Sequence, residues 1–452
     1  MATEGNKRRI VILGGGESGV GAAVLAKVKG FDLFLSDFGA ISQKYRDMLE
    51  KYEIPFEEGK HTEELILNAD EVIKSPGIPP TSPIMRKIAE KNIPVISEIE
   101  FAGRYTDAKM VCITGSNGKT TTTLLTYHIL SNAGINVGLA GNVGRSLAYQ
   151  VATEKHDVYV IELSSFQLEN MYHFKANVAV LMNITPDHLD RYDYQMQNYV
   201  KAKFRIINNM TSQDAIIYWQ DDPVIMDQFK HITTEAHLYP FAEHCHAGSA
   251  AFVDDDEELI LNTPETSLKM PRADLALTGL HNLFNSMAAG LSGCLLDVKK
   301  EDIRRSLSDF AGVEHRLEYV KDVDGVRYIN DSKATNVNSC WYALESMPKS
   351  KTTVLILGGK DKGNDYTEIL PLVQERVKTI VAMGKDNKKI LDFFGDTVQV
   401  IDTHSLADAV MACKNAATEG DTVLLSPCCA SFDLFKSYED RGRQFKDAVK
   451  AL

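Results

Sequence analysis

The stretch Val111–Thr123 reads VCITGSNGKTTTT, an apolar run that passes through two glycines into a lysine and a row of threonines. The run predicts a strand, and the threonines can cap and start a helix that stops near Gly134. Because a helix start attracts anions, Lys119 suits the terminal phosphates of a nucleotide and the Thr120 hydroxyl suits Mg²⁺. Ile113 stands where the strict P-loop has its first glycine, so this is a shortened variant, with a plain strand-to-helix turn as the alternative.

A second glycine-rich loop lies near the start of the chain. Arg8–Leu13 is apolar and is followed by Gly14, Gly16 and Gly19, a helical stretch, and a second expected strand that ends at Asp37. This is the outline of the dinucleotide-binding fingerprint, in which a helix start holds a diphosphate. The pattern fits any diphosphate-bearing molecule as well as NAD, and a tight glycine turn without a ligand is the alternative.

Polar residues follow two further apolar runs after the first stretch. Val158–Ile161 leads into Glu162, and Val178–Ile184 leads into TPDHLDRY, which contains His188. A carboxylate at the carboxyl edge of a parallel sheet, beside a phosphate loop, can hold Mg²⁺ directly or through water. The alternatives are a helix cap for Glu162 and a structural role for His188, which is otherwise a candidate metal ligand.

A helical stretch follows at 197–207. By pattern alone, its Lys201 and Lys203 are solvated charges. The region 254–258 is expected to be an acidic turn between edge strands, and 279–296 a buried helix that opens with polar residues.

Beyond Phe310–Arg316, apolar runs alternate with helical stretches, which predicts a parallel sheet covered by helices on both faces. We therefore expect an α/β protein of three domains: a Rossmann-like domain (1–109), a central P-loop-type domain with a mostly parallel sheet (110–314), and a second Rossmann-like domain (315–452).

Composition narrows the class of protein. The chain has 452 residues, 44% hydrophobic and 25% charged, with a formal net charge of -13. That charge argues against general affinity for nucleic acid or anionic membranes. The polar N-terminus runs directly into a strand, and no run is long enough to span a bilayer, so we expect a cytoplasmic protein. Its seven scattered cysteines are expected to be reduced thiols.

Seven motifs together resemble the Mur ligases of peptidoglycan synthesis, over nearly the whole chain. They are TGSNGKTT (114–121), ELSSFQLE (162–169), NITPDHLDRY (183–192), HNLFN (281–285), HR (315–316), NDSKATN (330–336) and LLSPCCASFD (424–433). SSFQLE together with DSKATN resembles the members that add D-glutamate. Glu17 departs from the family, in which an apolar residue is expected at this place.

The resemblance implies a role for each domain. The first would hold the UDP end of UDP-N-acetylmuramoyl-L-alanine rather than NAD, and the second ATP. The third domain would contribute residues that contact the nucleotide and residues that bind D-glutamate. The implied UDP-substrate residues are Gly16, Ser18, Asp37, Ser75, Gly77 and Asn142. The implied ATP residues are Gly115, Ser116, Asn117, Gly118, Lys119, Thr120, Thr121, Asn282, Asn285, Arg316 and Asp331. The implied D-glutamate residues are Lys333, Thr335, Lys362, Ser431 and Tyr438.

The resemblance also implies two magnesium sites, with Thr120, Glu162 and His188 as ligands and Lys203 as a carbamylated lysine on the second ion. Lys119, His188, Lys203 and Asn142 would be the catalytic residues. The expected reaction forms an acyl phosphate from the substrate carboxylate and ATP, and the D-glutamate amine then attacks it. We expect a monomer.

Three other functions fit parts of the pattern. A folylpolyglutamate synthetase would share the ligase chemistry but would take a substrate without UDP. A nucleotide-gated binding protein would keep the phosphate loop and make no bond, although intact Lys119, Glu162, His188 and Lys333 speak against it. A dehydrogenase would bind NAD at the first glycine loop and would leave the phosphate loop without a purpose.

Overall fold

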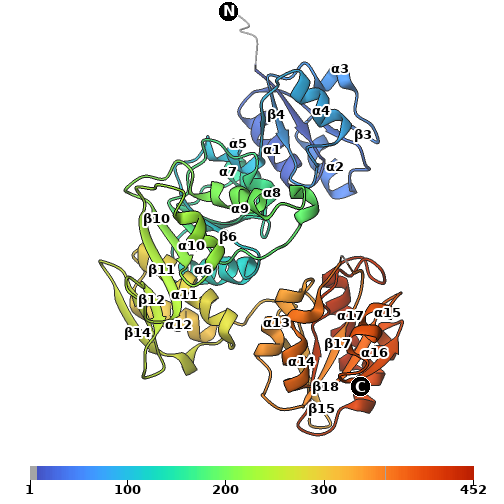
Figure 1. Cartoon of the computed structure of the whole chain (residues 1–452). Helices are drawn as coiled ribbons and strands as arrows, with labels where there is room; N and C mark the ends of the chain where they lie inside the picture. Colours follow the sequence, from blue (N-terminus) through green and yellow to red (C-terminus); the bar gives the residue numbers. More distant parts are fainter. Residues whose placement is uncertain (1–7, 362) are drawn as a thin grey trace, which may run out of the picture. The chain divides into compact units, whose positions relative to one another are not determined.

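The computed structural model describes residues 8–361 and 363–452. The chain forms two compact units, each with its own core. The first extends to Leu275 and includes Phe284–Asp309, and the second comprises Ala276–Leu283 and Phe310–Leu452. Figure 1 shows two sheets in the first unit and one in the second.

The first sheet is fully parallel, in the order β3-β2-β1-β4-β5. Side chains of β1 alternate between two apolar clusters, one on each face, which explains why the strand is apolar throughout. Because the strand order reverses between β1 and β4, the loops that follow these strands border the crevice where such sheets bind ligands. The strands are β1 (Arg9–Leu13), β2 (Asp32–Asp37), β3 (Phe56–Glu58), β4 (Glu71–Lys74) and β5 (Val95–Ile96). The helices are α1 (Glu17–Val28), α2 (Gln43–Lys51), α3 (Glu63–Ile66), α4 (Pro83–Glu90) and α5 (Glu98–Gly103).

The second sheet has the order β14-β13-β12-β11-β10-β9-β6-β8-β7. It is parallel except at the edge formed by β12, β13 and β14, where the expected acidic turn joins β12 to β13. Its strands are β6 (Lys109–Thr114), β7 (Val137–Gly141), β8 (Val158–Glu162), β9 (Val178–Leu181), β10 (Ala215–Trp219), β11 (His237–His244), β12 (Ala251–Val253), β13 (Glu258–Asn262) and β14 (Ser267–Pro271). The associated helices are α6 (Lys119–Asn132), α7 (Leu147–Thr153), α8 (Ser165–Leu168), η1 (Leu189–Tyr192), α9 (Met196–Phe204), η2 (Arg205–Ile207), α10 (Pro223–Phe229), η3 (Arg272–Asp274), α11 (Leu280–Leu295) and α12 (Lys300–Asp309).

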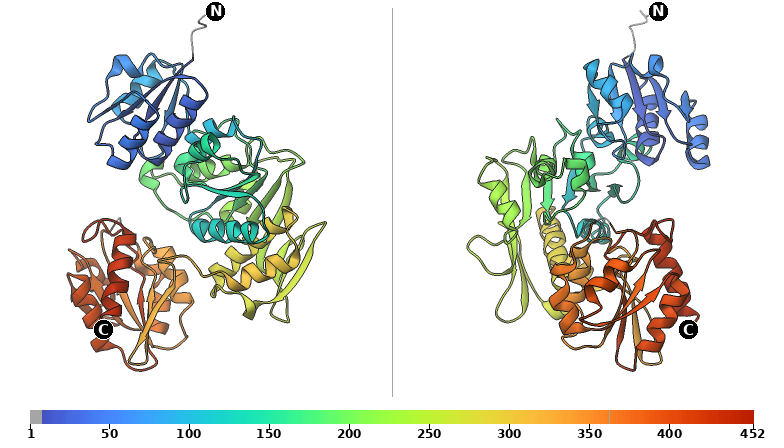
Figure 2. Two further views of the ribbon diagram at one scale, coloured as in Figure 1. Left: turned by 180° about the vertical axis from the view of Figure 1, so that it is seen from behind. Right: turned by 45° about the vertical axis from the view of Figure 1, so that its right-hand side comes forward.

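The third sheet has the order β15-β16-β20-β17-β18-β19 and is parallel except for β15. Figure 2 shows helices on both sides of it, as expected from the alternating pattern. Its strands are β15 (Glu318–Val323), β16 (Val326–Asn330), β17 (Thr353–Leu357), β18 (Val377–Met383), β19 (Gln399–Thr403) and β20 (Thr422–Leu425). Its helices are α13 (Val337–Glu345), η4 (Tyr366–Glu368), α14 (Leu370–Arg376), α15 (Lys388–Phe394), α16 (Leu406–Ala416) and α17 (Tyr438–Lys450).

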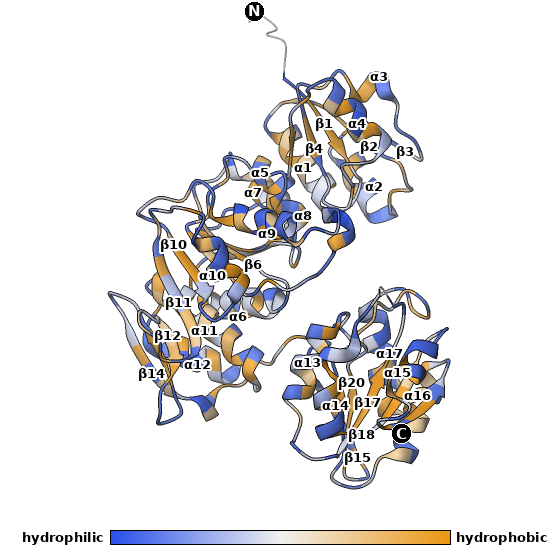
Figure 3. Cartoon of the chain, in the orientation of Figure 1, coloured by the Kyte–Doolittle hydropathy of each residue, from blue (hydrophilic) through white to orange (hydrophobic). Residues whose placement is uncertain are grey.

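The distribution of hydrophobic and hydrophilic residues agrees with the arrangement of the sheets and helices. Figure 3 shows the inner strands of each sheet as hydrophobic and the outward sides of many helices as hydrophilic. All seven cysteines are free thiols. Within the described part of the chain, no helix combines the length and apolarity needed to cross a bilayer.

Candidate functional site

The phosphate loop joins β6 to α6. The sequence predicted that a threonine would cap this helix, and that prediction is wrong: Gly118 is the N-cap residue, in the left-handed conformation with φ of 81°. A Cβ at Gly118 would lie 2.5 Å from Oδ1 of Asn285, so glycine is required by both conformation and space. Thr120 and Thr121 are buried in the first turn of α6.

The loop is tied to the chain that follows β9. The Ser116 hydroxyl donates to the carbonyl of Thr185 at 2.8 Å, and the backbone N–H of Asn117 donates to Oδ1 of Asn183 at 2.8 Å. The hydroxyl of Tyr199 lies 3.0 Å from Ser116 Oγ. These bonds fix the loop before any ligand arrives.

Two lysines converge on one carbonyl oxygen of this loop. Lys119 Nζ donates to Gly115 O at 2.8 Å, and Lys203 Nζ donates to the same oxygen at 2.7 Å. Lys203 is only 2% exposed, so the prediction of a solvated charge from the helical pattern is wrong for this residue, while Lys201 is exposed. Burial and the charge of Lys119 hold the pKa of Lys203 well below its usual value, which favours a neutral amine.

Glu162 ends β8 and is 1% exposed. Its Oε1 accepts from Asn142 Nδ2 at 2.8 Å, while its Oε2 has no hydrogen-bond partner among the described residues. A buried carboxylate oxygen without a partner is costly, and a divalent cation would satisfy it. Thr120 and Glu162 offer the hard oxygen ligands that Mg²⁺ prefers, and the unpartnered oxygen of Glu162 fits this ion. His188 is a further candidate ligand.

His188 lies beyond the end of β9 in a left-handed backbone conformation, with φ of 51°. Its ring packs edge-on against Phe166 at 5.2 Å between centroids. The guanidinium of Arg191 lies 4.2 Å from the centroid of the same Phe166 ring and pairs with Glu169 at 2.8 Å. The motifs 162–169 and 183–192 therefore form one packed group that orients the imidazole.

Two asparagines belong to α11. Asn285 is buried and its Oδ1 accepts from the hydroxyl of Thr122 at 3.1 Å, which joins α11 to α6. Asn282 is in the first turn of α11, and its Nδ2 donates to Thr278 O at 2.9 Å.

The first glycine loop is closed by an acidic residue. Asp37 at the end of β2 accepts from Gly15 N at 2.5 Å and from Gly39 N at 2.7 Å. A Cβ at Gly19 would lie 1.8 Å from Gly14 O, so glycine is needed where α1 packs against the loop. The neighbouring candidates are half-buried at Ser18 and Ser75 and exposed at Gly16 and Gly77.

In the second unit, candidates gather at the carboxyl edge of the third sheet. Asp331 accepts from Ser426 Oγ at 2.8 Å, and burial raises its pKa to about 7. Lys333 Nζ donates to the hydroxyl of Tyr438 at 3.1 Å. Ser431 is buried, and Thr335 follows Lys333 in the same loop. Lys362 lies outside the described residues.

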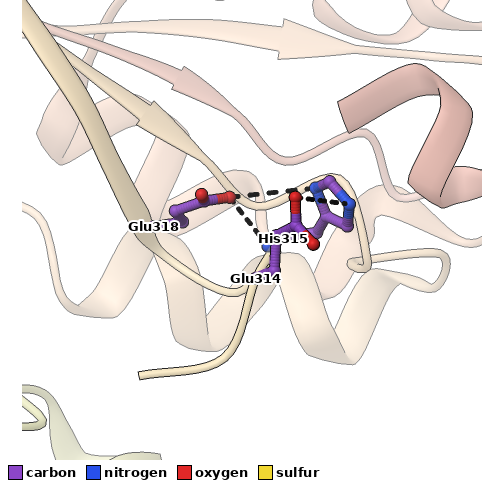
Figure 4. A group of neighbouring side chains, drawn as sticks. All are labelled: Glu314, His315 and Glu318. Carbon is purple, nitrogen blue, oxygen red and sulfur yellow. Dashed lines mark hydrogen bonds and ion pairs between the residues drawn. The ribbon is translucent and has the colours of Figure 1, made fainter. Parts of the chain in front are cut away.

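Arg316 lies within the segment that contains Glu314, His315 and Glu318, and Figure 4 shows the two carboxylates beside the imidazole of His315. Glu318 accepts from the backbone N–H of His315 at 2.9 Å. The ammonium of Lys446 forms ion pairs with one oxygen of each glutamate and so already supplies a cation to this group, and we assign no metal ion to it.

Two residues with supporting contacts were not singled out from the sequence. Tyr199 lies one helical turn before Lys203, whose Nζ is 4.6 Å from the tyrosine ring centroid, and this i, i+4 spacing could have indicated the pair. Arg441 is fully buried and donates to the carbonyls of Ser332 and Cys429. A charged residue within α17 gave no signal that it would be buried.

Comparison with known proteins decides the family. The sequence matches the MurD N-terminal domain over residues 9–84, the Mur ligase middle domain over 113–293 and the Mur ligase, glutamate ligase domain over 315–429. It is 63% identical to a Bacteroides fragilis protein named UDP-N-acetylmuramoylalanine--D-glutamate ligase, over 98% of this chain and 100% of that protein. The chain belongs to the Mur ligase family.

A second curated relative has the same name, and solved structures of Mur-type ligases have a similar fold. A Porphyromonas gingivalis protein of the same name is 55% identical, over 99% of each chain. Among solved structures, UDP-N-acetylmuramate-alanine ligase from Thermotoga maritima has a TM-score of 0.60 at 17% identity, over 98% of this chain and 99% of that one. A pseudomurein peptide ligase from Methanothermus fervidus has a TM-score of 0.63 at 19% identity, over 98% and 99%. These structural likenesses support the predicted α/β fold of a Mur ligase.

Proposed function

We propose that this Mur ligase adds D-glutamate to UDP-N-acetylmuramoyl-L-alanine at the expense of ATP, in peptidoglycan precursor synthesis. The curated relatives support this substrate pair because they carry that name at up to 63% identity over the full chain. Two features at the phosphate loop carry an ATP-dependent reaction. Oε2 of the buried Glu162 has no hydrogen-bond partner among the described residues, and Lys119 and Lys203 both donate to Gly115 O. A folylpolyglutamate synthetase remains the alternative within the same chemistry.

The first step of the proposed reaction activates the substrate carboxylate. A carboxylate is a poor electrophile, and transfer of the γ-phosphoryl group to it gives an acyl phosphate with ADP as the leaving group. Lys119 and the N–H groups of residues 115–121 would hold the phosphates, and charge on the transferred group would be stabilised by the lysine ammonium. Thr120, Glu162 and His188 would hold Mg²⁺, which when bound neutralises phosphate charge. Asn142 orients Glu162 through its 2.8 Å hydrogen bond.

The amine of D-glutamate must then attack the acyl carbon. The amine forms the amide bond, phosphate leaves, and one proton leaves the nitrogen. Lys333, Thr335, Lys362, Ser431 and Tyr438 would bind the two carboxylates of D-glutamate, since charge-assisted hydrogen bonds suit them. Arg316 and Asp331 would contact the nucleotide, with Asn282 and Asn285 near its adenine and ribose.

Lys203 is proposed to be carbamylated and to hold a second Mg²⁺ together with His188. Addition of CO₂ to a neutral amine, with loss of one proton, turns a cation into a bidentate oxygen anion of the kind Mg²⁺ binds. The reaction requires a neutral amine, and the burial of Lys203 beside Lys119 supplies that condition.

We also propose which part of the chain binds each substrate, and the location and oligomeric state of the protein. The UDP end would be held by Gly16, Ser18, Asp37, Ser75 and Gly77 within residues 1–109, ATP within 110–314 and D-glutamate within 315–452. We propose a cytoplasmic monomer that binds neither nucleic acid nor membrane, consistent with the net charge of -13.

The test is release of phosphate from ATP by the purified protein. Release should require both UDP-N-acetylmuramoyl-L-alanine and D-glutamate, and omission of either should abolish it. Release that depends on a folate and L-glutamate, with no response to the UDP substrate, would support the alternative and refute the proposal.

A further inference from the structure

Lys74 is the last residue of β4 and is only 3% exposed. Lysine is rarely buried this deeply in a protein unless its charge is paired. Among the described residues, no carboxylate oxygen lies within ion-pair distance of Lys74 Nζ, and the ammonium donates to two backbone carbonyls instead. A buried ammonium without a salt bridge costs free energy, so the stability of the fold alone does not explain this residue.

The two carbonyls belong to the turn that follows β4. Nζ of Lys74 lies 3.0 Å from the carbonyl oxygen of Ile78 and 3.4 Å from that of Ser75. Residues 75–80 read SPGIPP, and the prolines in this stretch have no N–H group to donate, so few backbone hydrogen bonds are available to it. One of these bonds, from Ile78 N to Ser75 O at 3.1 Å, closes a β-turn over residues 75–78. The ammonium of Lys74 therefore holds both ends of the 75–78 turn.

The 75–78 turn lies directly against the first glycine loop. A Cβ at Gly14 would be 2.4 Å from Ser75 Oγ, and Ser75 N donates to Leu13 O at 2.9 Å. The glycine loop and the turn follow β1 and β4, between which a sheet of this strand order binds its ligand. Ser75 and Gly77 of this turn are among the residues proposed to hold the UDP end of the substrate. The conformation of the turn thus decides where two proposed ligand contacts lie.

Two charged side chains act on Lys74 from the part of the chain that forms the second sheet. They are the guanidinium of Arg191 in η1 and the carboxylate of Glu169 after α8, which pair with each other at 2.8 Å. Burial and, to a smaller extent, the charge of Arg191 lower the pKa of Lys74 to about 8, while the charge of Glu169 opposes this shift. The ammonium is therefore the main form at neutral pH and is lost as the pH rises through about 8.

We propose that Lys74 is a positioning residue of the UDP site, whose ammonium holds the 75–78 turn in the conformation that receives the substrate. The proposal rests on the proposed function, because the turn has this role only if the first domain binds UDP-N-acetylmuramoyl-L-alanine. Lys74 does not contact the substrate and acts through the backbone of Ser75 and Ile78. A turn with few backbone hydrogen bonds would otherwise populate several conformations, and the apparent affinity would fall with the fraction that is competent to bind. An ammonium suits this task because charge-assisted hydrogen bonds are about twice as strong as neutral ones.

The proposal couples the binding of substrate to the binding of a proton. If the charged form of Lys74 favours the competent turn, the substrate binds the protonated protein more tightly and, by linkage, raises the pKa of Lys74. Substrate binding should therefore weaken as the pH rises through about 8, and in this range it should take up a proton. A lysine that only filled space with its methylene groups would give neither effect.

The experiment measures the dissociation constant of UDP-N-acetylmuramoyl-L-alanine for the full-length protein by calorimetry, below and above the pKa of Lys74. Titrations in buffers of different ionisation enthalpy give the number of protons taken up. Lys74→Met keeps the length of the side chain and removes the ammonium. It should weaken binding by about 10-fold at the lower pH, the scale of one hydrogen bond to a charged group, and should abolish both the pH dependence and the proton uptake.

Two further variants complete the comparison. Lys74→Arg keeps a charge that does not titrate in this range, so it should bind the substrate more tightly than the wild type at the higher pH. Lys91→Met makes the same substitution as Lys74→Met at an exposed position after α4, and should bind as the wild type does at both pH values. In steady-state kinetics, Lys74→Met should raise the KM for the UDP substrate and leave kcat and the KM for ATP near the wild-type values.

Each outcome separates the claims. If the wild-type protein binds the substrate and Lys74→Met binds it equally well, the positioning role is wrong and the proposed function stands. If the wild type shows neither the pH dependence nor the proton uptake, the ammonium does not hold the turn, and this result needs no variant that folds. If the wild type binds no UDP-N-acetylmuramoyl-L-alanine at any pH, the proposed function itself fails. An unchanged KM for ATP shows that each variant is folded.

Discussion

Lys119 ends the phosphate loop, and its Nζ donates to two carbonyls of that loop, Gly115 O at 2.8 Å and Ser116 O at 3.0 Å. Removal of this charge should lower the rate of phosphate release by about 100-fold or more in Lys119→Ala, the loss expected for one preorganised contact to a transferred group. Steady-state phosphate release measures the effect. Lys109→Ala, at the exposed start of the same strand β6, is the matched control and should be near wild type. Near-normal turnover by folded Lys119→Ala would refute the phosphate assignment.

Lys203 and Lys201 are two residues apart on α9 and offer a direct comparison, because one is buried and one exposed. Lys203→Ala should be nearly inactive, since the proposed carbamate would be lost, and small carboxylates such as formate should restore part of the activity. Lys201→Ala should retain wild-type activity.

The rescue distinguishes a lost ligand from a damaged fold, which formate could not repair. Full activity of folded Lys203→Ala in CO₂-free buffer would show that the carbamate has no role.

Single residues also show the limit of sequence reasoning. The periodicity of residues 197–207 placed Lys203 on a solvated face, yet the structure buries it beneath Gly115. The helix itself was predictable from local pattern, but the burial depends on packing against a loop 88 residues away. The site residues that stand directly at strand ends, such as Glu162, could be chosen from sequence because a parallel sheet brings those ends together.

At the scale of elements, α5 and α7 meet through a buried carboxylate. Glu98 in α5 is 3% exposed and accepts from Ser146 Oγ at 2.7 Å and Ala148 N at 2.6 Å, so it caps the start of α7. Burial raises its pKa to about 7, and the nearby charge of Glu17 adds to this effect. The carboxyl is thus protonated more readily in the folded than in the unfolded chain.

The raised pKa of Glu98 makes the stability of the fold depend on pH. A carboxyl whose folded-state pKa lies above the ordinary 4.5 stabilises the fold below pH 4.5, and this contribution is lost as the pH rises through about 7. A tenfold change in the proton affinity of one group changes the free energy of unfolding by about 1.4 kcal/mol. Relative to Glu98→Gln, whose amide does not titrate, wild-type protein should lose melting temperature between pH 4.5 and 7. A constant difference across this range, measured by thermal unfolding, would show that Glu98 has no raised pKa.

Elements were predicted best where local signals and packing agree. The strands β1, β4, β8 and β20 are short apolar runs buried on both faces and bounded by polar or glycine residues, so their positions follow from sequence. The start of α6 was predicted in the right place but with the wrong cap. The close approach of Asn285, which lies far along the chain in α11, favours glycine at Gly118, and no local pattern carries that information.

At the scale of the whole molecule, the proposed D-glutamate residues all belong to the second unit and the proposed UDP-substrate residues all belong to the first. Ser431→Ala should therefore raise the KM for D-glutamate, through loss of a hydroxyl donor, and leave the KM for the UDP substrate unchanged. Steady-state kinetics with each substrate varied in turn tests this. A rise in the KM of the UDP substrate alone would show that Ser431 is assigned to the wrong site.

The division into two units, each with its own buried core, leads to a test with fragments. The fragment 1–309 retains both glycine loops, Glu162, His188 and Lys203, so it should bind UDP with a dissociation constant within about 3-fold of the full-length value. It lacks Asp331, Lys333 and Ser431, so it should release no phosphate from ATP in the presence of both substrates. Calorimetry and phosphate release measure the two properties on one preparation. Turnover by this fragment alone would show that the second unit supplies no residue to the reaction, whereas loss of UDP binding would show that the first unit depends on the second for its site.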